Sequence, residues 1–425
     1  MTTVVGGTVA ALVAADALAR RGGPVELLLP RRGVGGGFAP LTVDGRRLER
    51  GIRVLELHYE GAGEPPPLEL YDAAGAGHRP FVARVDAYVR ALVGDAAVVP
   101  LGPARMWLGG RLVDEVLLGT DLARLELTPE QAAQVLRQVP QDGPGLLGPG
   151  GGDALWTTSL SDASRAHHGA LLHDLLVDAL ARKVRAAGGD DVPAALRRKL
   201  WLPLFHPTTV RQLAQGGGSA VTFRPRRPFH TVEPGGPGEI VTRLVARLEA
   251  ARQVTVRRID GVAQLAAGPG DTVLLTPVGE PTVSLERPVL ALAPGELFAA
   301  AGVAYRPERV TSVLAWVDVA AADAAAVPPF VHVLDPDVRA FRITRGAAVD
   351  GRVTICVELA HEVSQEAAPA VAADVLRRLG LIAASAPLTS LAAFAGPTFT
   401  APTFDSRARF DAARAAYDAL GIPAR

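Results

Sequence analysis

The chain lacks the residues that mark disulfide-stabilised or nucleic-acid-binding proteins. Its single cysteine, Cys356, lies in an apolar stretch that we interpret as a buried strand, so no internal disulfide can form. Lysine is almost missing, with Lys183 and Lys199 as the only two, and the formal net charge is +0. This balance argues against a nucleic-acid surface and against a membrane surface held by basic residues. We interpret the composition, rich in arginine, alanine, glycine and proline, as bacterial-type and GC-biased.

Long apolar runs are also missing. The first twenty residues are apolar enough to resemble a secretion signal, but Asp16 interrupts them and no basic residue precedes them. A strand, a turn and a helix explain the same residues better. No other segment approaches the length of a membrane span. We therefore expect a cytoplasmic protein without a membrane segment.

The chain does contain enough apolar sequence for a large core. Hydrophobic residues make up 48% of its 425 residues and charged residues 21%, which is typical of a globular protein rather than a disordered one. This length predicts two interleaved domains or one large α/β domain.

The first thirty residues have the pattern of a βαβ unit. The β-branched segment 2–5 is followed by Gly6-Gly7-Thr8, by a helix rich in alanine and leucine that ends near Arg21, and by the apolar strand 25–29. An apolar strand, a glycine turn, a helix and another apolar strand predict a parallel sheet.

Beyond this unit the sequence alternates between helices and short strands. The predicted helices cover 162–187, where leucines share one face, and 193–201, 207–215, 239–251, 367–379 and 406–420. The predicted strands cover 42–56 around the Asp44-Gly45 turn, 254–258, 261–265, 272–275, 288–293, 310–319, 330–334, 340–344 and 353–359.

Several short motifs follow one another in a specific order. The turn at 6–11 is similar to a dinucleotide-binding fingerprint, the glycine loop at 33–37 follows the second strand, and Glu233-Pro234-Gly235-Gly236 precedes a helix farther on. In this order the motifs resemble the FAD-dependent amine oxidase and protoporphyrinogen oxidase-like superfamily, UDP-galactopyranose-mutase-like members included. The resemblance extends over nearly the whole chain.

The resemblance implies an α/β fold with two interleaved domains. A Rossmann-like FAD/NAD(P)-binding domain would comprise 1–60, 227–294 and 367–425, and a substrate-type domain of mixed β-sheet and helices would comprise 61–226 and 295–366. The residues that would contact the cofactor are Gly6, Gly7, Thr8, Ala11, Gly36, Gly37 and Val262, the last through its backbone to adenine. The residues that would line the substrate cavity are His206, Tyr305 and Arg342.

The chain departs from that family where the flavin needs support. Thr8 replaces the middle glycine of the fingerprint, although its hydroxyl could donate to a phosphate instead. Leu29 or Pro30 stands where an acid would accept the ribose hydroxyls, and Phe38 replaces an arginine after Gly36-Gly37. The family's last glycine-rich segment is absent after 406–420, so we expect a degenerate, C-terminally truncated member. Together the losses would weaken FAD binding about a thousandfold or more.

Other candidate sites have weaker patterns. Arg31 and Arg32 follow the second strand, where arginines read the 2′-phosphate of NADP, but we favour the simpler interpretation of two arginines in an exposed loop of an arginine-rich protein. His167, His168 and His173 do not have the spacing of helical metal ligands, so no metal site is predicted. We find no independent catalytic set of residues.

Two functions remain open from the sequence. The first is a degenerate FAD-dependent oxidoreductase-like protein, a pseudoenzyme that acts as a binding or assembly subunit in a biosynthetic pathway, with a protein partner, a second copy of itself or a small-molecule ligand. The second is an active FAD-dependent oxidoreductase or mutase that acts on a small molecule. In both, the flavin would bring the chemistry, since the protein supplies position and electrostatics.

Overall fold

The fold is described from a computed structural model. It covers residues 1–51, 54–57, 78–117, 122, 125–140, 151–185, 187–200, 202–205, 207–216 and 229–423. Within these ranges, no helix combines the length and apolar character that a membrane crossing requires.

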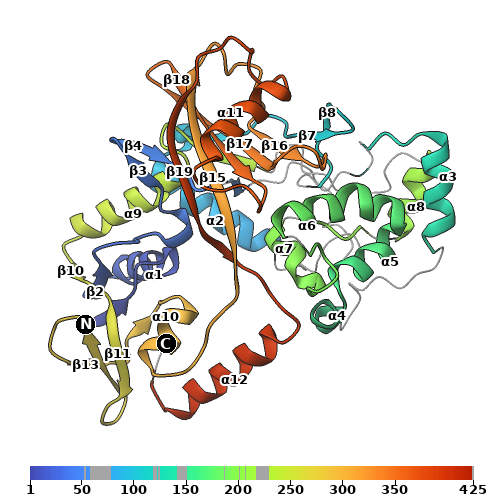
Figure 1. The fold of residues 1–425 in the computed structure, drawn as a ribbon. Helices are drawn as coiled ribbons and strands as arrows, with labels where there is room; N and C mark the ends of the chain where they lie inside the picture. Colours follow the sequence, from blue (N-terminus) through green and yellow to red (C-terminus); the bar gives the residue numbers. More distant parts are fainter. Residues whose placement is uncertain are drawn as a thin grey trace.

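A four-stranded parallel sheet forms the first layer. Its strands run in the order β10-β2-β1-β14, and they comprise β1 (Thr2–Val5), β2 (Val25–Pro30), β10 (Val254–Ile259) and β14 (Val289–Leu290). Helices α1 (Val9–Arg20), α2 (His78–Val93) and α9 (Gly238–Ala250) pack together on this sheet, as Figure 1 shows. The βαβ unit predicted from the sequence is confirmed.

A β-meander extends this nucleotide-type part of the fold. Strands β11 (Val262–Ala267), β12 (Thr272–Pro277) and β13 (Val283–Glu286) pair antiparallel. They share a core with α10 (Pro294–Ala300) and α12 (Ser406–Ala419), in which Phe298 and Tyr417 are buried.

A seven-stranded sheet forms the second layer, in the order β19-β15-β18-β17-β16-β7-β8. Its strands are β7 (Arg105–Leu108), β8 (Arg111–Asp114), β15 (Arg309–Ala320), β16 (Phe330–Val333), β17 (Ala340–Val349), β18 (Arg352–Leu359) and β19 (Thr389–Thr400). Every second residue along its strands points to one face of the sheet, and this apolar face is covered by α11 (Ala368–Arg378). The opposite face carries Trp316, Arg342 and Glu358, and the hairpin β3 (Leu41–Val43) and β4 (Arg46–Leu48) packs on it around Trp316.

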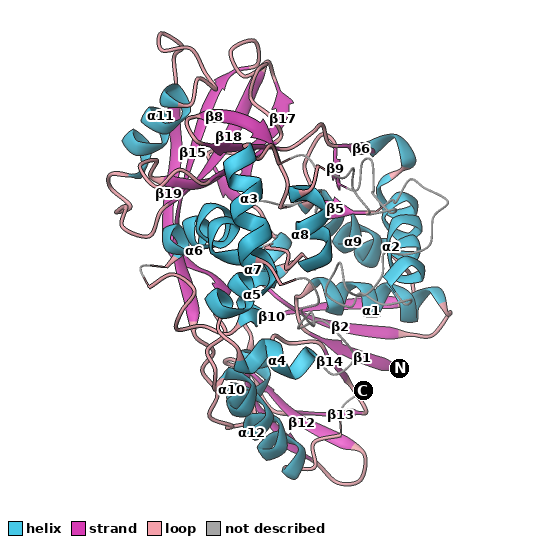
Figure 2. Ribbon diagram, turned by 90° about the vertical axis from the view of Figure 1, so that its right-hand side faces the viewer, coloured by secondary structure: helices cyan, strands magenta, loops and turns pink. Residues whose placement is uncertain are grey.

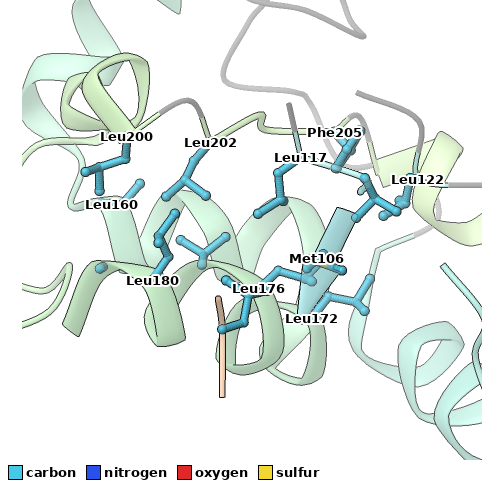
Figure 3. Packing of buried hydrophobic residues seen from close by; sticks show 14 of the residues in the cluster. Met106, Leu117, Leu122, Leu160, Leu172, Leu176, Leu180, Leu200, Leu202 and Phe205 are labelled. Atoms are coloured by element: carbon cyan, nitrogen blue, oxygen red, sulfur yellow. The ribbon is translucent and has the colours of Figure 1, made fainter. Parts of the chain in front are cut away.

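A helical region lies to one side of both sheets (Figure 1). It contains α3 (Pro129–Gln138), α4 (Gly151–Thr157), α5 (Leu160–Leu172), the π-helical segment η4 (His173–Asp178), α6 (Ala179–Val184), the turn η5 (Ala194–Leu196), α7 (Arg197–Leu200) and α8 (Pro207–Ala214). Figure 3 shows its core, in which Leu172, Leu176 and Leu180 face Leu160, Leu202 and Met106.

The single helix predicted over 162–187 is interrupted. Gly169 has φ 75°, outside the helical range, and a Cβ there would lie 2.8 Å from the Cβ of Gln138. The Gln138 side chain instead accepts a hydrogen bond from the backbone of Leu171 across the break, at 2.9 Å. Tertiary packing against α3 therefore overrides the helical pattern at this glycine.

Shorter elements complete the described part. These are the strands β5 (Leu55–Glu56), β6 (Val98–Pro100) and β9 (Phe229–Val232), which pair with each other, and the 3₁₀ turns η1 (Gly36–Phe38) and η2 (Asp95–Ala97).

The division of the chain between the two layers differs from the sequence prediction. Residues 367–425 were expected in the nucleotide-binding domain, but α11 packs on the seven-stranded sheet and β19 pairs with β15 in it. Only α12 returns to the first layer. In the opposite direction, α2 lies within the predicted substrate-type segment 61–226, yet Val85 and Val89 pack with α1 and α9. Long-range strand pairing and side-chain packing decide these assignments, and neither is encoded in local pattern.

Candidate functional site

The glycine turn between β1 and α1 is held by contacts within the protein. Gly6 has φ 133°, and its backbone N–H donates to Leu28 O at 3.0 Å. A Cβ at this position would lie 2.5 Å from the carbonyl oxygen of Ala291, next to β14. Glycine is therefore required here by the close approach of a neighbouring segment, whether or not a ligand is bound.

The second glycine of the turn is covered by two other segments. A Cβ on Gly7 would lie 2.5 Å from Cγ of Pro30. The backbone N–H of Gly35, in the glycine loop, donates to Gly7 O at 2.6 Å. The proline ring at the end of β2 and the glycine loop thus both rest on the turn.

Thr8 uses its hydroxyl group twice within the chain. The hydroxyl donates to Ala291 O at 2.9 Å and accepts from the backbone N–H of Ala11 at 3.2 Å, which makes Thr8 the N-cap of α1. Its one proton is already engaged, so it has no hydrogen left for a phosphate. The possibility that Thr8 donates to a pyrophosphate is therefore not supported. The cap also takes the Ala11 N–H that a bound anion would use.

The end of β2 offers no acceptor for a ribose. Leu29 is 1% exposed, and Pro30 pairs with Ile259 of β10. The next residue, Arg31, forms an exposed ion pair with Asp260, with Nε and Oδ1 3.1 Å apart. Arg32 is exposed. Arg31 is thus partly neutralised at the position where NADP-binding domains hold the 2′-phosphate.

The remaining predicted cofactor residues lie around this turn without completing it. A Cβ on Gly36 or Gly37 would meet nothing within 4 Å, so the outer part of the glycine loop is open. Val262 begins β11 opposite Pro277, with a register irregularity between Val262 and Gln264. Taken together, the residues present do not fit FAD as a dinucleotide-binding fold holds it. Thr8 caps the helix N-terminus at which the pyrophosphate would lie, and the ribose would face Leu29 and Pro30, which offer no acceptor.

The predicted substrate residues do not form one site. His206 lies outside the described residues. Arg342, in β17, donates through Nη2 to Glu358 Oε2 at 2.6 Å, and the side chains of the pair are 9% and 4% exposed. A Cβ on Gly51 would lie 2.9 Å from the Glu358 carboxylate, so the pair packs against the segment after β4. The ion pair gives Arg342 a structural role, and its place in a substrate cavity stays a prediction.

Beside Arg342 the same face of the sheet carries a buried imidazole. His332, which is opposite Arg342 in the β16–β17 pairing, has Nδ1 at 3.0 Å from Oε1 of Glu115. Its Nε2, like Nε of Arg342, has no hydrogen-bond partner within the part of the chain that the structure describes. Glu115 and His332 were not singled out in the sequence, since they lie far apart in it and are brought together only by the sheet.

Tyr305, the third predicted substrate residue, lies elsewhere. It lines a cavity of about 740 Å³ together with its neighbour Arg306. The other residues of this cavity include Trp156 of α4, Lys199 of α7 and Phe410 of α12. The sequence pattern did not predict these neighbours. The elements that hold them come from four distant parts of the chain.

Two histidines of the helical region, His167 and His168, have structural partners, whereas neither ring nitrogen of the buried His173 has a hydrogen-bond partner among the described residues. His168 Nε2 accepts from the backbone N–H of Phe205 at 2.8 Å, and His167 Nδ1 lies 2.9 Å from Phe205 O. Burial lowers the pKa of His168 well below its usual value, because an imidazolium would lose its hydration there. Among the described residues, no group of His, Cys, Asp and Glu is arranged to hold a metal ion.

Comparison with known proteins shows solved structures that have a similar fold. No family model and no curated protein matches the chain. Among solved structures, a reduced UDP-galactopyranose mutase superimposes with a TM-score of 0.72 at 13% identity, covering 99% of this chain and 86% of that one. An oxidoreductase from Methanosarcina mazei gives a TM-score of 0.53 at 12% identity, covering 94% and 90%. A redesigned putrescine oxidase gives 0.52 at 15% identity, covering 95% and 88%.

The chain has the fold that these solved structures share, a UDP-galactopyranose mutase and a putrescine oxidase among them. The fold class and the resemblance predicted from the sequence are confirmed by this likeness. At these identities the similarity concerns the fold, and the chemistry must be argued from the site itself.

Proposed function

We propose that this chain is a non-catalytic protein of the flavin-oxidoreductase fold that acts by binding. Thr8 carries the proposal. Its hydroxyl donates to Ala291 O and caps the Ala11 N–H, so the hydroxyl proton and one backbone donor are already engaged at the helix terminus where a dinucleotide would place its pyrophosphate.

The residues at the end of β2 would also weaken the binding of FAD. A ribose placed beside Leu29 and Pro30 would lose its hydrogen bonds to water without gaining an acceptor, at a cost of about 1–3 kcal/mol. The loss of pyrophosphate contacts adds to this cost. Weakened binding of FAD by about a thousandfold or more would leave the protein without flavin at ordinary cofactor concentrations.

A reconstitution experiment tests the proposal. The wild-type protein is expected to purify without visible flavin absorbance and to bind added FAD weakly in calorimetry. The double variant Thr8→Gly with Pro30→Glu restores bare backbone at the helix and an acceptor at the strand end. It should bind FAD about tenfold more tightly or better.

Thr8→Ser is the matched control, because serine keeps both the cap and a Cβ at this position. It should bind FAD as weakly as the wild type. Wild-type protein that carries stoichiometric flavin after purification would show that the cleft accepts the cofactor after all, and the proposal would then be wrong.

The open side of the glycine loop favours one alternative, an active flavin-dependent oxidoreductase or mutase. A Cβ at Gly36 or Gly37 would meet no atom within 4 Å, so the space beside their backbone is open. Glycines in such a loop would allow a ligand to approach the backbone closely. In that case activity on a small molecule should disappear when flavin is removed and return when it is added.

A further inference from the structure

A cavity of about 740 Å³ lies between the helical region and the nucleotide-type part of the fold. One wall is formed by α4, by η5 and by Lys199 of α7. The other is formed by the first turns of α12 and by the two connections, at 305–308 and 400–402, that lead into and out of the seven-stranded sheet. Figure 2 shows α4 beside α12 at this place, where Asp153 of α4 forms an ion pair with Arg407 of α12. None of the lining residues belongs to the glycine turn or to the glycine loop, so the cavity is distinct from the dinucleotide cleft.

Aromatic rings line the cavity from both walls. Tyr305 and Phe410 have ring centroids 5.8 Å apart at an interplanar angle of 74°, and both contact the buried ring of Phe298. This packing holds the two rings in place. Trp156, on α4, also lines the cavity. Aromatic side chains of this kind are suited to contact a planar ring.

The charged groups of the cavity are of two kinds. Arg407 is paired with Asp153, and Arg409 Nη2 lies 3.1 Å from Oε1 of Glu308, so these four charges are balanced. Lys199 and Arg306 also line the cavity, are exposed, and have no ion-pair or hydrogen-bond partner among the residues that the structure describes. Among the residues that line the cavity, the positive charges outnumber the negative ones by two, and Lys199 and Arg306 are the two without a partner among the described residues.

We propose that this cavity binds a small anion that carries a flat ring, such as the phosphate monoester of a nucleoside or of a phenol. The ring would lie between Trp156 and the pair Tyr305 and Phe410, and the anionic group would accept hydrogen bonds from Lys199 and Arg306. A volume of this size is within the range of small-molecule sites in proteins. The inference deepens the proposal that the chain acts by binding, but it uses none of the residues that decide whether FAD binds.

Calorimetric titration of the full chain tests both halves of the ligand. The probes are AMP, UMP and phenyl phosphate, with adenosine, uridine and inorganic phosphate as the separate halves. At least one ring-bearing phosphate should bind about tenfold more tightly than its parent ring compound and than inorganic phosphate, because both contacts are then made. Its affinity should fall as salt concentration rises.

Variants locate the binding site. Lys199→Met and Arg306→Gln should each weaken that binding about tenfold, since each removes one charged donor. Arg252→Gln is the matched control, because Arg252 is exposed, lies outside the cavity and has no ion pair among the described residues; it should leave the affinity unchanged. Thermal unfolding of each variant confirms that it is folded.

Two results would overturn the inference: no ring-bearing phosphate binds at millimolar concentration, or binding is unaffected by Lys199→Met and Arg306→Gln. Neither result bears on flavin, which is measured separately by its visible absorbance. Failure of this site and failure of the proposed function are therefore distinguishable.

Discussion

Gly6 and Gly37 lie in glycine-rich segments of similar composition, but their surroundings differ. At Gly6 the backbone has φ 133° and a Cβ would be 2.5 Å from Ala291 O, whereas a Cβ at Gly37 would meet nothing within 4 Å. Gly6 is thus needed for the path of the chain between β1 and α1. Glycine at 37 is not required by any neighbouring atom in the fold.

Gly6→Ala should therefore lower the free energy of unfolding by about 2–4 kcal/mol, through backbone strain and the clash with β14. Gly37→Ala should change it by less than about 1 kcal/mol. Urea unfolding of both variants, in the absence of any nucleotide, measures the difference. Equal effects at the two positions would contradict the view that the fingerprint glycine now serves the fold.

At the scale of elements, Asp16 joins three helices. It is 2% exposed on α1, where its carboxylate accepts from Arg20 at 2.5 Å and from the Tyr88 hydroxyl on α2 at 2.8 Å; Arg247 of α9 lies 3.5 Å away. Burial raises the pKa of Tyr88, and the hydrogen bond to Asp16 raises it further, since an ionised phenol could not donate to the carboxylate.

Asp16→Asn should lower the free energy of unfolding by about 1–3 kcal/mol, because Arg20 and Arg247 lose the charge that they share. It should also lower the pKa of Tyr88 from its raised value, while burial still holds that pKa above 10.0. Ultraviolet titration of phenolate, with Tyr88→Phe subtracted, measures the shift. An unchanged Tyr88 pKa would mean that the hydrogen bond is not formed in solution.

Elements with a local signal were predictable from the sequence. Helices α9, α11 and α12 and strands β15, β16 and β18 lie within a few residues of their predicted positions, because caps, glycine stops and apolar periodicity are local features. Strand β19 was not predicted. Its alanines and Pro397 have low strand propensity, and it is held by pairing with β15.

The candidate sites could likewise be predicted where their residues form a local motif, and not where they meet only in the folded chain. The sequence placed Thr8, Leu29 and Pro30 at the dinucleotide turn, since a fingerprint is a contiguous motif. It did not reveal that Ala291 engages the Thr8 hydroxyl, because the two residues are 283 positions apart. The cavity around Tyr305 was missed for the same reason: its walls meet only in the folded chain.

At the scale of the whole molecule, the chain is a framework of two sheets and a helical region, and the Thr8 hydroxyl at the turn before α1 is engaged by the chain's own groups. Lys183 links two of these parts, since its Nζ, on α6, donates to Val333 O at 2.8 Å and to Ala340 O at 2.9 Å at the ends of β16 and β17. The helical region is thus attached to the seven-stranded sheet through a buried lysine.

This linkage should make stability depend on pH. Burial lowers the pKa of Lys183 from 10.5 to about 7, although Asp335, Asp337 and Glu362 oppose the shift. Below about pH 7 the lysine is protonated in both the folded and the unfolded state, so it contributes no pH dependence. Between about pH 7 and pH 10 only the unfolded state holds the proton, so stability should rise with pH, by at most about 1.4 kcal/mol per unit.

Subtracting Lys183→Met from the wild type isolates this contribution. Unfolding free energies measured from about pH 6 to about pH 9 should differ by an amount that is constant below pH 7 and grows in favour of the wild type above it. Lys199→Met, at the only other lysine, is the matched control for the loss of a lysine, because Lys199 is exposed and links no two parts of the fold by a hydrogen bond among the described residues. A flat difference for Lys183→Met would mean that Lys183 keeps its charge in the folded protein, held by the two carbonyl groups and the acidic residues around it.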